Sequence, residues 1–86
     1  MDTVQPSTVP SAVITPQLAQ HVLWHFSQGG YQPGTFTSLL LQTIGHADTE
    51  NRERLRIAFP NHVRAFEMGA NETYGIDRLR KIASER

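Results

Sequence analysis

Proline and glycine residues divide this 86-residue chain into segments that are each about as long as one short helix. Thr15-Pro16 and Asp48 are signals for a helix start, because a Thr or Asp side chain can accept a hydrogen bond from the first turn. Gly29-Gly30 is a stop signal, since glycine readily adopts the left-handed conformation that ends many helices. Pro60 lacks a backbone N–H and interrupts the helical pattern around it. These start and stop signals favour an assembly of short helices.

Apolar residues recur at helical spacing within these segments, and no segment keeps the strict alternation that indicates a strand. We therefore expect an all-α fold, with residues 15–86 as a single small helical bundle behind an extended, flexible N-terminal arm at residues 1–14. The expected helices number about four, at about 15–27, 36–46, 49–68 and 76–84, with the third kinked or split at Pro60.

The positions of the apolar residues assign an inward face to the first two expected helices. The spacing places Trp24 opposite the apolar stripe of the first helix and Leu41 off the main stripe of the second. We expect Thr35 to cap the second helix and Gly69 to end the third. The expected inward-facing residues are Leu18, Ala19, Val22 and Phe26 in the first helix, and Phe36, Leu39, Leu40, Thr43 and Ile44 in the second.

Formal charge is distributed very unevenly along the chain. No charged residue occurs from Thr15 to Ala47, whereas all eight Lys and Arg residues lie from Arg52 onward. A domain this small leaves one face of each helix in water, and protein-interface cores are depleted of charge and enriched in aromatic residues. We therefore expect the 15–47 helical hairpin to bind a protein partner or a second copy of the chain. The expected partner-binding residues are Trp24, His25, Tyr31 and Leu41.

The basic residues of the second half raise an alternative, a small helical nucleic-acid-binding or regulatory module. Its binding residues would be Arg52, Arg56, Arg80 and Lys81. Acidic residues are interleaved with these basic ones, and the formal net charge of the chain is zero. Mixed charge along a helix is typical of a solvated face. The sequence therefore favours protein binding over nucleic-acid binding.

Motifs for catalysis and for metal or phosphate binding are weak in this chain. His21 and His25 are spaced to share a helix face and could chelate a metal, but the chain has no cysteine as a further ligand, and His46 and His62 could complete a site only if the fold brought them together. The glycine-bearing loop at 29–34 lacks the lysine of a phosphate-binding loop. Ser27 or Ser38 could be drawn with His25 and Asp48 as a triad, but no spacing supports one. We expect no enzymatic activity, cofactor, metal or small-molecule substrate.

The chain shows neither the basic and apolar regions of a signal peptide nor the run of about 20 apolar residues that spans a membrane. We therefore expect the protein to be cytoplasmic and to make no contact with a membrane. If a phage encodes the chain, the expected location is the host cytoplasm.

Several short motifs carry a resemblance to a group of proteins. They are Trp24-His25-Phe26, Gly29-Gly30-Tyr31-Gln32-Pro33-Gly34, Phe36-Thr37, Ala47-Asp48, Asn51-Arg52, Arg54-Leu55, Phe59-Pro60 and Gly75-Ile76-Asp77-Arg78-Leu79. Over about residues 23–83 the chain resembles small uncharacterised helical proteins of actinobacteria and their phages. It departs from them at Thr49, where a proline is expected, and at Ser27-Gln28, where glycine is more usual. The resemblance implies a phage or prophage origin and, by analogy, an accessory protein that binds a host protein.

Overall fold

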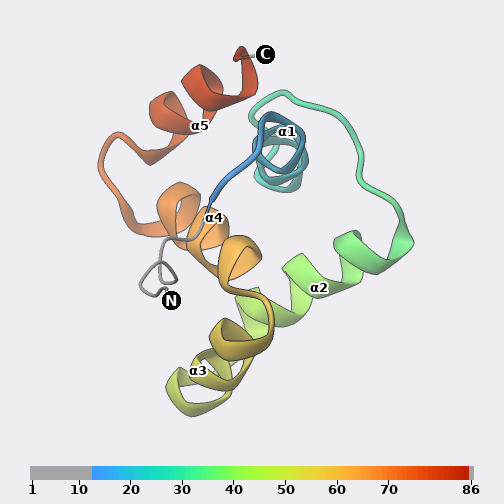
Figure 1. Ribbon diagram of the computed structural model, residues 1–86, viewed down its shortest axis with the longest axis vertical. Coiled ribbons are helices and arrows are strands. Elements are labelled where there is room, and N and C mark those ends of the chain that lie inside the picture. Colours follow the sequence, from blue (N-terminus) through green and yellow to red (C-terminus); the bar gives the residue numbers. More distant parts are fainter. Residues whose placement is uncertain (1–12, 86) are drawn as a thin grey trace, which may run out of the picture.

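The computed structural model describes residues 13–85 and folds them into five α-helices, with no strand in that range (Figure 1). The expected all-α class is confirmed. Residues 1–12 of the expected arm lie outside the described residues. The helices are α1 (Pro16–His25), α2 (Thr35–His46), α3 (Thr49–Ala58), α4 (Pro60–Asn71) and α5 (Gly75–Ala83).

The fifth helix arises because the expected third helix is split at Pro60. Phe59, with φ −135° and ψ 62°, leaves the helical conformation, and α4 begins at the proline. A proline in the first turn of a helix loses no hydrogen bond, whereas inside a helix it would lose one. Of the two sequence-based options, a kink or a split, the structure has the split.

Two of the expected helix caps are confirmed and one is wrong. The Thr15 hydroxyl accepts a hydrogen bond from the Leu18 N–H at 3.1 Å, and the Asp48 carboxylate accepts one from the Asn51 N–H at 2.8 Å. The cap of α2 is Gly34, which offers no side-chain acceptor, and Thr35 is the first helical residue.

The end of α1 is closed by a left-handed serine rather than by glycine. Ser27 has φ 58°, the Gln28 N–H bonds to the Leu23 carbonyl, and the Ser27 N–H bonds to the Trp24 carbonyl. This pair of bonds is the usual C-terminal closure, in which glycine normally takes the left-handed position. The helix therefore ends at His25, two residues before the expected boundary. Gly29 and Gly30 are also left-handed, but they lie in the connection to α2.

The core lies where α1 packs against α5 and α4, with α2 lying across α4 and α1. Gly69 is inside α4, so the expectation that it ends a helix is wrong. A Cβ at this position would lie 2.8 Å from the Phe26 ring, which means that the glycine permits the close approach of α4 to the end of α1. The buried apolar residues are Leu18, Ala19, Val22, Leu23, Leu40, Leu41, Ile44, Val63, Ala65, Phe66, Met68 and Leu79.

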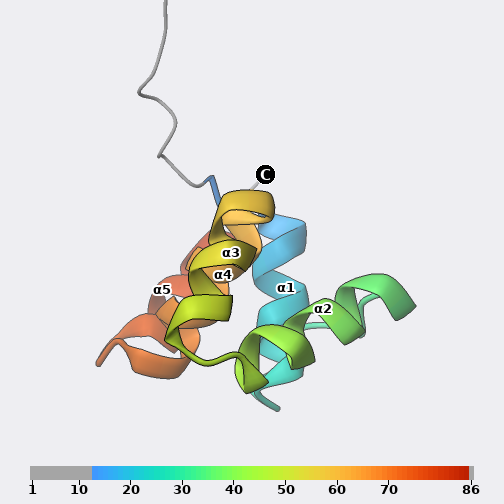
Figure 2. The same cartoon turned by 90° about the horizontal axis from the view of Figure 1, so that it is seen from below.

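The rotation of α2 about its axis differs from the expected one. Leu41, expected off the main stripe, is 0% exposed, and it shares the inward face with Leu40 and Ile44. Phe36 and Leu39, expected inside, are 65% and 56% exposed. Apolar residues cover most of the circumference of α2, so spacing alone could not say which of them would meet α4. The N-terminal half of α2 extends beyond the other helices (Figures 1 and 2).

Candidate protein-interaction site

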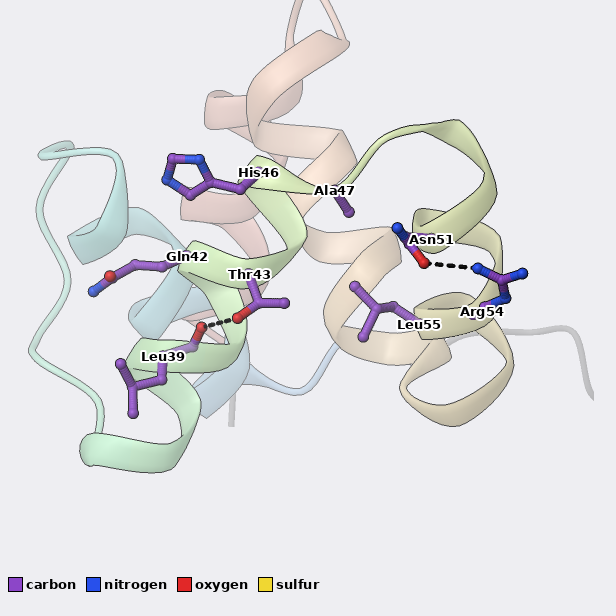
Figure 3. Close-up of a pocket in the computed structure, with 8 residues that line it drawn as sticks. All are labelled: Leu39, Gln42, Thr43, His46, Ala47, Asn51, Arg54 and Leu55. Carbon is purple, nitrogen blue, oxygen red and sulfur yellow. Dashed lines mark hydrogen bonds between the residues drawn. The ribbon is translucent and has the colours of Figure 1, made fainter.

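An open groove of about 540 Å³ lies between α2 and α3, which are joined at Ala47-Asp48 and make few other direct contacts (Figure 3). We call it the α2–α3 groove. One face of α2 forms one wall of the groove, and one face of α3 forms the other. Its lining residues are Leu39, Gln42, Thr43, His46, Ala47, Asn51, Arg54 and Leu55.

The α2 wall of the groove is apolar or neutral along its whole length. Leu39 and Thr43 lie one turn apart on it, and His46 follows near the end of the helix (Figure 3). The Thr43 hydroxyl donates a hydrogen bond to the Leu39 carbonyl at 2.8 Å. Because the hydroxyl hydrogen is already bonded within α2, an apolar partner can cover the Thr43 side chain without leaving this donor unpaired.

The α3 wall carries the only formal charge of the lining, and that charge is already paired. The Arg54 guanidinium donates to the Glu50 carboxylate at 2.9 Å and to the Asn51 side-chain oxygen at 2.8 Å. Leu55, half-buried, supplies the apolar surface of this wall. An occupant of the groove therefore meets apolar surface without having to supply a counter-charge.

Phe36 extends the exposed apolar surface of α2 by one turn beyond Leu39. Its ring contacts that of Phe59, in the link between α3 and α4, at a centroid distance of 5.9 Å. This contact supports the projecting end of α2, yet most of the Phe36 side chain stays in water. Apolar surface of this kind, contiguous and accessible, is typical of interaction sites.

Two arginines hold α3 in place behind the groove. The Arg52 guanidinium donates to the Ile44 carbonyl at 2.9 Å and lies over the Phe66 ring. The Arg56 guanidinium binds both carboxylate oxygens of Glu67, each at 2.8 Å, and also binds Glu53. These bonds lower the pKa of the Glu67 carboxyl and fasten α3 to α4. The Arg52 hydrogen bond to the Ile44 carbonyl thus ties α3 to α2, and the Arg56–Glu67 ion pair ties α3 to α4.

Three of the four basic residues expected to bind nucleic acid are engaged within the molecule. Arg52 and Arg56 make the contacts just described, and the Arg80 guanidinium donates to the backbone and side-chain oxygens of Gln28. Lys81 is exposed on α5. The four are divided between α3 and α5, and those two helices make few contacts with one another.

The four expected partner-binding residues do not form one surface. Trp24 and His25 line an open pocket of about 520 Å³ with Gly29 and Gly30, and Trp24 is 40% exposed. Tyr31 packs edge-on against His21 at 5.3 Å instead. Leu41 is buried in the core, so the expectation that it contacts a partner is wrong. Its side chain points into the molecule because α2 is rotated from the expected orientation.

The histidines of α1 and α4 are packing residues with lowered basicity. His25 lies against the rings of Phe26 and Phe66, and His21 and His62 line a pocket of about 370 Å³ between α1 and α4. Burial lowers the pKa of all three imidazoles, and the nearby His21 lowers that of His62 further. Among residues 13–85 no group of three or more His, Cys, Asp or Glu side chains is placed to hold a metal ion.

Phe36 beside the groove, and Leu39, Thr43 and Leu55 in its lining, were not identified as site residues from the sequence. The first three were assigned to the core, because they share a helical stripe with Leu40 and Ile44. A second pattern was present that could have identified them: Phe36, Leu39, Thr43 and His46 are spaced by three, four and three residues. That spacing is typical of a helix face that packs on another helix.

Comparisons of the chain with models of protein families, with curated proteins and with solved structures gave no significant match. None of the helices in the described part of the chain combines the length and the apolar character needed to cross a membrane.

Proposed function

We propose that this protein acts by binding another protein chain, and that the α2–α3 groove is the binding site. The single observation that carries the proposal is the uncharged outer face of α2, on which Leu39 is 56% exposed beside a groove that no other part of the described chain fills. Exposing a leucine and a phenylalanine on the same helix is unfavourable in water and becomes favourable when a partner covers them.

The shape of the groove favours a helix as the bound element. Two helices that are joined at one end and separated along their length leave a channel between them, and amphipathic helices bind in such channels through side chains one turn apart. Leu39 and Thr43 lie one turn apart on α2, and Leu55 of α3 lines the same groove. The resemblance to phage proteins favours an accessory role, in which a small phage-type protein binds a host protein.

Nucleic-acid binding receives no comparable support. The guanidinium groups of Arg52 and Arg56 are directed to Ile44 and Glu67, and those bonds hold the fold together. Binding phosphates through them would require breaking contacts between α3 and its neighbours.

Photo-crosslinking tests the proposal. The photoreactive residue p-benzoylphenylalanine is introduced in place of Leu39 or, as a matched control, in place of Ile57, which is an apolar residue of α3 outside the groove lining and is 85% exposed. We expect irradiation in extracts of cells that express the chain to give a discrete protein adduct from position 39 and little from position 57. Equal adducts from both positions, or none from position 39, would contradict the proposal.

A further inference from the structure

We propose that the occupant of the α2–α3 groove is α2 of a second copy of this chain, so that the α2 and α3 helices of two chains form an antiparallel four-helix bundle. This inference rests on the proposed function, because it names the partner of the same groove. Three observations carry it: the spacing of the exposed residues of α2, the charge of the groove, and the presence of both complementary surfaces on one chain.

The exposed stripe of α2 has the same spacing in both directions. Phe36, Leu39, Thr43 and His46 are all exposed, and they are separated by three, four and three residues. When two such helices pack antiparallel, a two-fold axis near the middle of α2 places Leu39 opposite the partner's Thr43. The same axis places Phe36 opposite the partner's His46. A surface with this symmetry can pair with itself, as the interface of a two-fold dimer requires.

The charge of the groove fits a neutral occupant. Arg54 is the only formally charged residue of the lining, and Glu50 and Asn51 already bind it. An acidic or basic helix would meet one cation, Arg54, which is already paired with Glu50, and no acidic residue in the lining. The helix α2 has no formally charged residue between Thr35 and His46, so two copies can approach without like-charge repulsion.

The chain supplies both the projecting side chains and the space that receives them. Phe36 and Leu39 project from α2, while the groove beside the half-buried Leu55 remains uncovered within one copy. Pairing two copies would therefore bury the projecting residues of each chain against α2 and α3 of the other. An 86-residue domain buries a small share of its surface, so it gains stability from such an interface.

Sedimentation equilibrium over a wide concentration range tests the inference on the full chain. The wild type is expected to reach twice the monomer mass of 9.7 kDa. Leu39→Glu is expected to weaken dimerisation on the order of 100-fold or more, since it places a carboxylate at the centre of each half of the interface. Ile57→Glu, at an exposed position outside the groove lining, is expected to leave the dimer unchanged, and circular dichroism confirms that both variants fold.

Disulfide trapping tests the antiparallel register. The chain contains no cysteine, so single substitutions give clean reporters. When Leu39→Cys chains are mixed with Thr43→Cys chains and oxidised, we expect the mixed disulfide to form faster than either symmetric one. Preferred symmetric disulfides would overturn the register.

Each remaining outcome also has a definite meaning. A wild-type monomer at every concentration would overturn the dimer, as would a dimer that Leu39→Glu leaves intact or that Ile57→Glu disrupts equally. If the chain is monomeric but position 39 still cross-links to a different protein, the inference fails and the proposed function stands. If neither a dimer nor a cross-link is found, both fail.

Discussion

Leu39 and Leu41 are two residues apart on α2, yet the structure gives them opposite environments. Leu41 is 0% exposed within the core, whereas Leu39 is 56% exposed at the groove. Replacing each in turn by alanine makes the same chemical change at both positions. The comparison therefore reports the rotation of α2 about its axis, on which the groove depends.

The expected losses in the free energy of unfolding follow from burial. Leu→Ala removes about three methylene equivalents, each worth about 0.8 kcal/mol when fully buried, or about 2.4 kcal/mol in total. At Leu41 the unfilled cavity raises the loss to about 3–4 kcal/mol. At Leu39 water already reaches more than half of the side chain and no cavity remains, so the loss is about 1 kcal/mol or less.

Urea unfolding followed by far-ultraviolet circular dichroism measures both losses. The measurement is made at a protein concentration at which sedimentation reports a monomer, so that association does not contribute. A loss for Leu39→Ala equal to or greater than that for Leu41→Ala would refute the reasoning. That result would place Leu39 inside, and the groove would lose its apolar α2 wall.

Three further substitutions test other parts of the structure. Ser27→Gly is expected to stabilise the fold by about 0.5–1 kcal/mol in urea unfolding, because glycine adopts the left-handed conformation at the end of α1 without strain, and unchanged or lower stability would argue against that closure. Gly69→Ala is expected to destabilise by about 1–3 kcal/mol despite the better helix propensity of alanine, because the new Cβ would contact the Phe26 ring, and a thermal melt showing higher stability would contradict this packing. The pKa of Glu67 is lowered in the folded state, so its contribution to stability is present above its ordinary value of 4.5 and is lost as the pH falls through the folded value. Glu67→Gln should thus be less stable than wild type at pH 7 and lose less stability on acidification, and parallel loss in the two proteins would count against the ion pair.

The local signals in the sequence predicted most of the helix boundaries. Thr15 and Asp48 cap the helices that they were expected to cap, and Pro60 separates α3 from α4. These signals succeed because a cap or a proline acts through the backbone within one turn of its own position. The left-handed Ser27 was missed, since serine is not the residue that this conformation favours.

The candidate site was predicted only in its general character. The absence of charge from 15 to 47 indicated a protein-binding surface, and the proposed groove takes one wall from that region. The particular residues were not predicted, because apolar residues on two sides of α2 offer two inward faces. Contacts of α2 with α4 and α1 select the face that contains Leu41, and such contacts between distant segments are not visible in local spacing.

The other wall of the groove was missed for a different reason. If the helical spacing is continued through Pro60, Leu55 shares one apolar face with Val63 and Phe66 of the next segment. The helix α3 ends at the break at Phe59, and Leu55 is half-buried: it packs against the edge of the core and also lines the groove. Bidentate pairing between Arg56 and Glu67 then holds α3 in that position.

Hydroxyl-radical footprinting tests most directly whether the outer face of α2 is the surface that a partner covers. The oxidation rate of each side chain is measured in dilute pure protein, in concentrated pure protein and in extracts of cells that express the chain. We predict that Phe36 and Leu39 become protected in at least one of the latter two conditions, while Ile57 and Tyr74, both highly exposed, react at unchanged rates. Unchanged labelling of Phe36 and Leu39 in all conditions, or protection centred on Trp24 instead, would contradict the account.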